Sequence, residues 1–398
     1  MKSLASRNAR ITTSQTVAID AKYKRLKSEG KDVLSLGAGE PDLDTPDYAK
    51  EAAILSIRQG LTKYSSVTGL PPLKQAISRK FTDVNGLAYT PDQITVSGGA
   101  KHCVFNTLMA LIEEGDEVLI PSPCWVTYPE LVLLLGGKPV LIPTTLESGF
   151  KVTAEQLQAA ITEKSKLFIL NSPANPTGAV YTEQELRQLA WVVVENDLYC
   201  LSDEIYEHIV YGDARHVSIG SLGLDIFCRT ATVNGMSKAY AMTGWRIGYV
   251  GAPPALAAAI ASIQSHGTHH PANASQYAAL ACLEADQGFV MRLRAHLNEC
   301  RTIALGRLER IPGLRVCEPQ GAFYVFFDVQ TYLGKSFHGK AVASSMDLCE
   351  YLLDEQLLAT VPGSSFGLEG YMRISFASGL PDLEAALARL ERGLLALE

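Results

Sequence analysis

The chain has 398 residues, 47% of them hydrophobic and 19% charged, which is enough for a large core and for more than one domain. Its formal net charge of -7 offers no electrostatic basis for binding a polyphosphate backbone, so we expect no nucleic-acid partner. The N-terminal stretch lacks the apolar region of a signal peptide, and no later apolar run approaches the roughly 20 residues of a membrane helix. We therefore expect a cytoplasmic protein without a membrane partner.

Apolar runs suited to buried parallel strands recur through the middle of the chain. They are Ile94–Val96, Glu117–Ile120, Leu167–Leu170, Tyr199–Ser202, Thr230–Val233 and Ile247–Val250. Amphipathic helical patterns alternate with several of them, at Lys101–Glu113, Val126–Leu135, Thr153–Ile161 and Glu183–Asn196. This succession predicts an α/β fold with a mostly parallel sheet covered on both faces, whose ligands collect beyond the carboxyl ends of the strands.

The last part of the chain follows a different order. A helical pattern from about Gln287 to Glu309 leads into the apolar segment GAFYVFFDV, and a second helix is expected at Asp347–Glu355 before VPGSSFG and MRISFA. This order predicts a smaller α+β domain. We place an N-terminal arm that belongs partly to this small domain at residues 1–45, the large domain at 46–285 and the small domain at 286–398.

Glycines follow the first predicted strand, where the segment SGGAKH turns into a helix. Gly98 and Gly99 permit close approach of the backbone, and the free amide groups of a helix that starts at Ala100–Lys101 suit a phosphate. A turn of this kind without a ligand is equally consistent with the sequence. Trp125, in PSPCWVTYP after the next strand, can stack on a flat ring, although a lone Trp is more often a partly buried aromatic residue.

Polar residues follow two further strands. NSPANPTG presents Asn175 in a tight turn, either as a hydrogen-bonding group for a ligand or as an ordinary turn residue. SDEIYEH places Asp203 and Tyr206 at the end of the next strand. Its two adjacent carboxylates suit a metal, but no His/Cys cluster accompanies them, and the eight scattered cysteines form no C-x-x-C pair. We therefore predict neither a metal site nor a disulfide framework.

Two segments place basic residues in apolar surroundings. GMSKAYAMTGWRIGY carries Lys238 and Arg246, and Lys238 lies among small and apolar residues, where a lysine can lose its proton and act as an amine nucleophile. Arg373 lies within the apolar strand MRISFA, where an unpaired guanidinium is costly to bury. Either a carboxylate side chain or a carboxylate ligand should therefore meet Arg373.

The motifs, in this order, resemble those of a known family. LGAGEPDLDTP, TKYSSVTGLPPL, PCWVTYPE, NSPANPTG, SDEIYEH, SKAYAMTGWRIGY and MRISFA are together similar to class I aminotransferases of fold type I, which use pyridoxal 5′-phosphate (PLP). The similarity covers the whole chain and is closest to the bacterial aspartate aminotransferase subgroup. It implies a large domain with a mostly parallel central sheet flanked by helices, together with a smaller α+β domain.

The resemblance also implies how the cofactor ring is used. Lys238 would form the Schiff base with PLP and then move a proton between the substrate and the cofactor, a task that needs a depressed amine pKa. Asp203 would pair with the pyridine nitrogen and keep it protonated, so that the ring accepts electrons. Tyr206 and Asn175 would hydrogen-bond the phenolic oxygen of the ring, and Trp125 would stack on its face.

The cofactor phosphate has its own expected partners. The resemblance assigns it to the backbone of Gly99, Ala100 and Lys101, the guanidinium of Arg246 and a hydroxyl near Ser237. Tyr64 is also expected to bind it, arriving from the other subunit. If so, each site needs two subunits, and a homodimer follows.

The resemblance also implies which residues bind the substrate. Arg373 would hold the α-carboxylate of the substrate in a bidentate fork, and Gly39, Trp125 and Asn175 would lie beside it. The distal carboxylate would meet Lys101 together with Ser14 and Thr16. This set favours ping-pong transamination between aspartate and 2-oxoglutarate. A prephenate or broader-specificity aminotransferase is the alternative.

Two features depart from the subgroup. His266, His269 and His270 stand where relatives usually carry Ser, Thr or Gln, and Cys124 replaces a common Tyr. The histidines would change charge between about pH 5 and 8. They are either structural, or an added cation that strengthens dicarboxylate binding or admits a different side chain.

Three rival functions remain open. A PLP-dependent C–S lyase or a cyclase on the same fold is disfavoured by the aspartate-type motifs. A ligand-sensing regulator would need an added nucleic-acid-binding module, and almost nothing precedes the first motif. A dinucleotide-dependent dehydrogenase would need G-x-G-x-x-G between a strand and a helix, and GAGEPD lacks that spacing.

Overall fold

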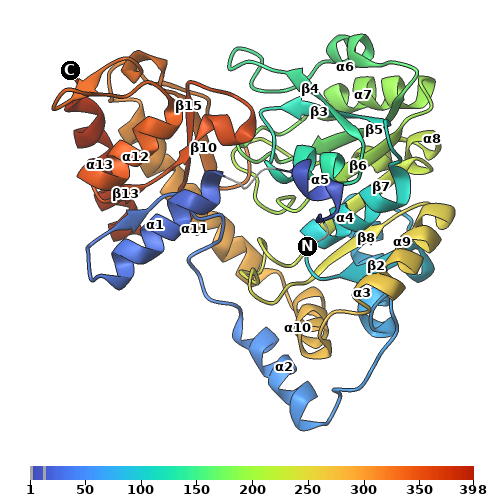
Figure 1. The fold of residues 1–398 in the computed structure, drawn as a ribbon. Coiled ribbons are helices and arrows are strands. Elements are labelled where there is room, and N and C mark those ends of the chain that lie inside the picture. The colour runs from blue at the N-terminus through green and yellow to red at the C-terminus, as the bar shows by residue number, and fades with distance from the viewer. Residues whose placement is uncertain (1–2, 12–14) are drawn as a thin grey trace.

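A large α/β part and a smaller α+β part make up the molecule, with the N-terminal helix α1 (Gln15–Ser28) lying beside the smaller one (Figure 1). The computed structural model describes residues 3–11 and 15–398, and for residues 15–18 and 20 it describes the backbone alone. Within these ranges, no helix has both the length and the apolar character needed to cross a membrane. All eight cysteines are unpaired.

The large part is built on a seven-stranded sheet. Its strands, in spatial order, are β2 (Ile94–Ser97), β8 (Gly248–Gly251), β7 (Thr230–Gly235), β6 (Tyr199–Asp203), β5 (Ser165–Asn171), β3 (Glu117–Ser122) and β4 (Lys138–Pro143). β8 runs antiparallel to both of its neighbours, and the other described pairs of this sheet are parallel. The mostly parallel sheet is thus confirmed, but the prediction of a parallel strand at Ile247–Val250 was wrong in direction.

Alternating side chains on the buried strands face two layers of helices. Val118, Leu167 and Leu201 pack against α4 (Ala100–Leu111), α5 (Thr127–Leu134) and α9 (Pro254–Gly267). Leu119, Phe168 and Cys200 pack against α6 (Ala154–Ala160), α7 (Glu183–Glu195) and α8 (Leu224–Phe227). Because both faces are covered, the strands are apolar throughout rather than alternating, which is why they could be recognised in the sequence.

Local sequence explains where two helices of the large part begin. Thr153 and Thr182 each cap a helix in a reciprocal capping box, with Gln156 and Glu185 respectively.

Three further helices belong to the large part, namely α2 (Asp47–Arg58), α3 (Pro71–Asn85) and α10 (Asn273–Glu284). α10 packs against both α2 and α3, so the chain before the first central strand is held by a helix that follows the last one.

The smaller part has an antiparallel sheet with helices packed on it. Its strands are β14 (Val361–Pro362), β15 (Tyr371–Ser375), β10 (Tyr324–Asp328) and β9 (Arg315–Val316), and its helices are α11 (Gly288–Leu308), α12 (Ser345–Glu355) and α13 (Leu380–Leu395). β11 (Ser336–Phe337) and β12 (Lys340–Ala341) form a separate hairpin. β1 (Leu34–Ser35) pairs in parallel with β13 (Leu358–Ala359), so the N-terminal segment contacts the C-terminal part. The exact domain boundaries stay a prediction.

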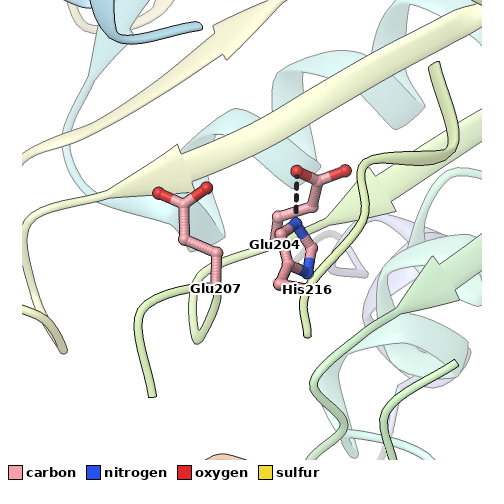
Figure 2. A group of neighbouring side chains, drawn as sticks. All are labelled: Glu204, Glu207 and His216. Atoms are coloured by element: carbon pink, nitrogen blue, oxygen red, sulfur yellow. Dashed lines mark hydrogen bonds and ion pairs between the residues drawn. The ribbon is translucent and has the colours of Figure 1, made fainter. Parts of the chain in front are cut away.

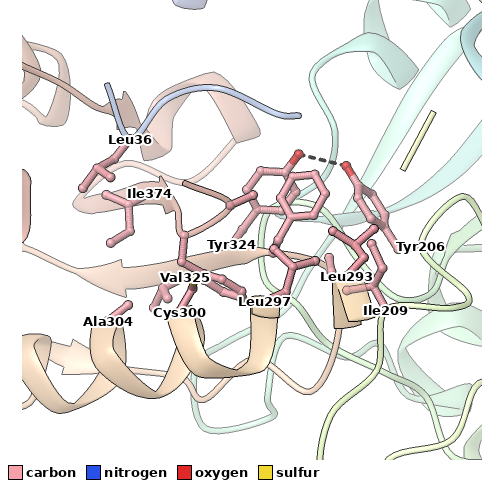
Figure 3. Close-up of a cluster of buried hydrophobic side chains, with 14 of the residues drawn as sticks. Leu36, Tyr206, Ile209, Leu293, Leu297, Cys300, Ala304, Tyr324, Val325 and Ile374 are labelled. Atoms are coloured by element: carbon pink, nitrogen blue, oxygen red, sulfur yellow. Dashed lines mark hydrogen bonds between the residues drawn. The ribbon is translucent and has the colours of Figure 1, made fainter. Parts of the chain in front are cut away.

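A shared apolar cluster joins the two parts. Figure 3 shows Leu293 and Leu297 of α11 beside Ile209 of the large part, with β10 packed on the same helix. The hydroxyl groups of Tyr206 and Tyr324 are 2.8 Å apart and form a hydrogen bond across this junction. Burial of these side chains fixes how the two parts meet, and therefore fixes the shape of the space between them.

Candidate active site

A cavity of about 730 Å³ lies at the carboxyl edge of the central sheet, bordered by the smaller part and the N-terminal segment. Most residues predicted for the site line it, namely Gly39, Ala100, Lys101, Trp125, Asn175, Asp203, Tyr206, Ser237, Lys238, Arg246 and Arg373. Arg246 precedes β8 in the sequence, so it reaches the carboxyl edge only because β8 runs antiparallel to its neighbours. The cavity also brings together residues that are more than 300 positions apart and come from outside the central sheet, as with Gly39 and Arg373.

Lys238 lies on the turn after β7 with its amine buried in the cavity. Its Nζ donates a hydrogen bond to the backbone carbonyl of Gly39. Burial lowers the pKa of this amine from 10.5 to about 8; Glu40 opposes the shift, whereas the positive charges of Arg373 and Arg246 add to it. An amine with this pKa is neutral often enough near neutral pH to act as a nucleophile.

Asp203 ends β6 and is 3% exposed. Its Oδ2 accepts a hydrogen bond of 2.7 Å from the hydroxyl of Tyr128, and its Oδ1 accepts one from the backbone N–H of Ile205. Burial raises the pKa of Asp203 to about 6, and the bond from Tyr128 works in the opposite direction. The carboxylate is therefore mostly ionised at neutral pH, although it forms no ion pair within the described residues.

Arg373 is a buried guanidinium whose polar partners are neutral. Its two terminal nitrogens donate to Oδ1 of Asn175 at 3.0 Å and to the carbonyl of Gly37 at 2.8 Å. Tyr324 and Phe366 enclose it, with ring centres 4.3 and 4.9 Å from Cζ. Its Nε is buried without a partner, and no carboxylate of the described residues pairs with it. Of the two possibilities left by the sequence, pairing with a carboxylate side chain is not found among the described residues, and the carboxylate ligand stays a prediction.

A relay of side chains connects these groups. The backbone N–H of Asn175 donates to Oδ1 of Asn171 at 2.9 Å, and Nδ2 of Asn171 donates to the backbone carbonyl of Asp203 at 2.9 Å. Sequence reasoning missed Asn171 and also Tyr128, which contacts Asp203. The position of Tyr128 three residues after Trp125 was the available signal, because residues three apart at the start of a helix share a face.

A second, positively charged region surrounds the start of α4. Gly99 has φ 94°, and a Cβ there would collide with the guanidinium of Arg246, so the turn needs glycine for this close approach. Arg246 donates to the carbonyl of Thr243 at 2.8 Å and forms no ion pair within the part of the chain that the structure describes. The start of a helix beside a guanidinium that has no ion-pair partner among the described residues has the charge that suits an anion.

Lys101 lies in the first turn of α4, and its side chain lies over the ring of Trp125. Its Nζ lies 5.0 Å from the centre of the Trp125 ring, and Trp125 meets Tyr128 edge to face at 5.2 Å. Burial lowers the pKa of Lys101, and the nearby charge of Arg246 lowers it further. Lys101 is a further basic group in the lining of the cavity.

Four predicted residues, Gly99, Tyr64, Ser14 and Thr16, are not among those that line the cavity. Gly99 directly precedes Ala100, which does line it. Tyr64 is 90% exposed and does not line it. Ser14 lies outside the described residues, and Thr16 belongs to α1 by its backbone while its side chain is outside the description. The contribution of these two hydroxyl groups therefore stays a prediction.

The three histidines in the last turn of α9 and just after it do not line the cavity of their own chain either. His266 is exposed on the last turn of α9. The rings of His269 and His270 instead contact the ring of Tyr64, with centroids 5.2 and 6.0 Å away. Within this chain they add no cation to the cavity.

A separate cluster of ligand-type side chains lies behind the end of β6, as Figure 2 shows for Glu204, Glu207 and His216. Nε2 of His216 is 3.0 Å from Oε2 of Glu204. A histidine that is not adjacent in the sequence therefore lies beside this carboxylate in the fold, and the expectation that none accompanies the carboxylates was wrong. Lys80 forms a buried ion pair with Glu207, and Asn85 donates to Glu207 at 2.7 Å. Because Lys80 already balances the charge of Glu207, the cluster serves as a structural link between α3 and the segment that follows β6, the strand that carries Asp203.

Comparison with known proteins agrees with this geometry. The family model described as aminotransferase class I and II matches residues 31–390. An aspartate aminotransferase of Bacillus sp. is 45% identical, over 98% of both chains, and an aspartate/prephenate aminotransferase of Nitrosomonas europaea is 44% identical, over 97% of this chain and 98% of the relative. A crystal structure of aspartate aminotransferase from Rhizobium meliloti superposes with a TM-score of 0.96 at 44% identity and covers 100% of both chains.

Proposed function

Because the chain belongs to the class I and II aminotransferase family, we propose that its cavity binds PLP and transfers the amino group of aspartate to 2-oxoglutarate. When bound, PLP supplies an aldehyde that amines can attack and a ring that takes up electrons released at the substrate Cα. The proposed kinetics are ping-pong, since one cavity serves both the amino acid and the oxo acid. The observation that carries the proposal is Arg373, a buried cation that meets no carboxylate within the described residues.

The residues present fit the cofactor at each of its functional groups. Arg246 and the amides at the start of α4 would hold the phosphate, together with Ser237. Asp203 would pair with the ring nitrogen, and Trp125 would lie against the ring. Tyr206 and Asn175 would meet the phenolic oxygen; Asn175 keeps its amide nitrogen for this purpose, because only its Oδ1 is used by Arg373.

Lys238 acts as the nucleophile and the proton carrier in this proposal. With a pKa of about 8, roughly one amine in ten is neutral at pH 7, against fewer than about one in a thousand for an ordinary lysine. The neutral Nζ can attack an aldehyde, and later it can take the proton from the substrate Cα. The carbonyl of Gly39 holds Nζ in place in the meantime.

Asp203 holds a negative charge in a dry position. Burial raises its pKa only to about 6, so it is anionic at neutral pH. A buried anion beside a ring nitrogen favours the protonated nitrogen, which is the electron-accepting form. Tyr128 would keep the carboxylate oriented, since its hydroxyl donates to Oδ2 and leaves Oδ1 to face the backbone N–H of Ile205 and the ring.

Charge distribution supports a dicarboxylate substrate. Arg373 would take the α-carboxylate, and Lys101, near Trp125, would take the distal one with Ser14 and Thr16. Prephenate, which also carries two carboxylates, is the second candidate acceptor, because relatives such as that of Nitrosomonas europaea are named for both substrates.

Exposed apolar residues support a homodimer. Around α2 and the loop after it, the exposed large hydrophobic side chains are Ile54, Leu55, Ile57, Leu61 and Tyr64. Such a patch on a helix face is typical of a subunit interface. It would bring Tyr64 to the phosphate in the other subunit, where its own chain does not place it.

A substrate panel tests the proposal. Purified PLP-loaded protein is given aspartate, glutamate, phenylalanine or cystathionine with 2-oxoglutarate, oxaloacetate or prephenate, and products are quantified. Oxaloacetate from aspartate and 2-oxoglutarate is expected. Pyruvate and ammonia from cystathionine, without oxaloacetate from aspartate, would instead assign the protein to C–S lyases.

A further inference from the structure

Hydrogen bonds fix the chain on both sides of Tyr64, although the Tyr64 side chain is 90% exposed. Nδ2 of Asn273 donates to the carbonyl of Lys63 at 2.6 Å and to that of Leu61 at 3.3 Å. On the other side of Tyr64, the hydroxyl of Ser65 donates to Oδ1 of Asn273 at 3.0 Å. Ordering a loop costs conformational entropy, and an exposed aromatic side chain makes few contacts that offset this cost. Hydrogen bonds that fix the loop on both sides of Tyr64 therefore indicate that the position of its ring has a role.

His270 makes the central contact of this support. Its Nε2 accepts the backbone N–H of Ser65 at 3.0 Å, and its Nδ1 is 2.7 Å from the carbonyl of Pro271. A backbone N–H can only donate and a carbonyl can only accept, so this ring carries its proton on Nδ1 and is neutral. The same ring lies edge to face with Tyr64, and the ring of His269 lies beside both.

We propose that His270 is a positioning residue for cofactor binding in trans: by accepting from Ser65 it holds Tyr64 in the direction that reaches the PLP phosphate of the partner subunit. This inference rests on the dimeric aminotransferase proposed above and extends it. It replaces the expectation that the histidine is an added cation for the substrate, because both ring nitrogens of His270 are used by the backbone.

A matched pair of substitutions tests the role of the acceptor. Gln can place its amide oxygen near the position of Nε2, so His270→Gln keeps the acceptor, whereas His270→Leu removes it at similar size. If Tyr64 gives the phosphate one charge-assisted hydrogen bond, His270→Leu and Tyr64→Phe should each raise the Kd for PLP about tenfold or more. His270→Gln should stay within about twofold of the parent. Affinity for pyridoxal, which lacks the phosphate, should be the same in all four proteins.

Two further measurements separate positioning from general damage. In the double variant His270→Leu with Tyr64→Phe, the Kd for PLP should equal that of Tyr64→Phe alone, because both changes remove the same contact. In hybrid dimers, one subunit carries Lys238→Ala and the other carries His270→Leu. The remaining Lys238 then receives Tyr64 from the unchanged loop, and its PLP affinity should return to the parent value.

The possible outcomes are distinct. Loss of affinity in Tyr64→Phe but not in His270→Leu overturns the role of His270 and leaves the proposed function intact. Equal loss for pyridoxal and PLP in His270→Leu also overturns it, since that pattern marks a distorted cavity. No change in Tyr64→Phe overturns both this inference and the shared site, while borohydride tagging of Lys238 by PLP still reports independently on the aminotransferase proposal.

Discussion

Replacing Arg373 with Lys should separate recognition of the α-carboxylate from every other step. Lysine keeps the positive charge but loses the two-nitrogen fork that now spans Asn175 and Gly37. One hydrogen bond to a charged group is worth about 1.5–3 kcal/mol. Loss of one such bond and imperfect placement of the other cost about 2–4 kcal/mol, which lowers kcat/KM for aspartate by about 30- to 1,000-fold.

The assay compares aspartate with β-alanine, which lacks only the α-carboxylate. The parent enzyme should prefer aspartate strongly, and Arg373→Lys should remove most of that preference while the Kd for PLP changes less than about threefold. Stability is monitored by urea unfolding, so that loss of folded protein is not read as loss of recognition. If the ratio of the two kcat/KM values were the same in parent and variant, Arg373 would not be the carboxylate site, and the argument from its missing ion pair would fail.

Three other perturbations address the remaining groups. Lys238→Ala should still bind PLP noncovalently but lose almost all turnover and the borohydride tag on its peptide, as followed by mass spectrometry. In the cofactor-free protein, the rate at which Lys238 captures pyridoxal should rise with pH and level off above about pH 8, where the depressed pKa leaves the amine neutral; a rise continuing toward pH 10.5 would show an ordinary lysine. Lys101→Ser should weaken dicarboxylate substrates about tenfold more than monocarboxylate ones, and equal losses would point to a phosphate or folding role. Lys80→Met should lower the free energy of unfolding by about 3–5 kcal/mol in urea titrations, because the buried Glu207 would lose its lysine partner and keep Asn85 and His208 beside it, whereas a change below about 1 kcal/mol would mean that the pair is open to water.

The buried parallel strands could be read from the sequence because both of their faces are covered. Leu167–Leu170 is apolar at every position, and all four side chains are buried in β5. β4 could not be read in this way. It lies at the edge of the sheet, where Ile142 is its one buried residue, and its apolar run Val140–Ile142 is enclosed by Pro139 and Pro143, which disfavour a buried strand. The direction of β8 was also missed, since composition marks a buried strand but not which way it runs.

The site divides along similar lines. Lys238 and Arg373 were recognisable because a cation inside an apolar segment conflicts with ordinary packing. Tyr324 and Phe366 were not, because an aromatic residue inside an apolar segment has the same appearance whether it packs in the core or encloses a guanidinium. The pairing of Glu204 with His216 was hidden for a third reason, since contacts across a turn depend on how the chain folds back.

The charges of the cavity suit the proposed binding of a cofactor together with a dicarboxylate. Lys101, Arg246 and Arg373 are cations that form no ion pair within the described residues, and the only acids lining the cavity are Glu40 and Asp203. Burying a cation without a partner is costly, and burial lowers the pKa of Lys238 to about 8 and also lowers that of Lys101. Of the three cations other than Lys238, Arg373 is buried, whereas Lys101 and Arg246 are exposed, so the cost of burial falls mainly on Arg373. In the proposed function, a phosphate and two carboxylates would supply one anionic group for each of the three, and the α-carboxylate would offset the cost of burying Arg373.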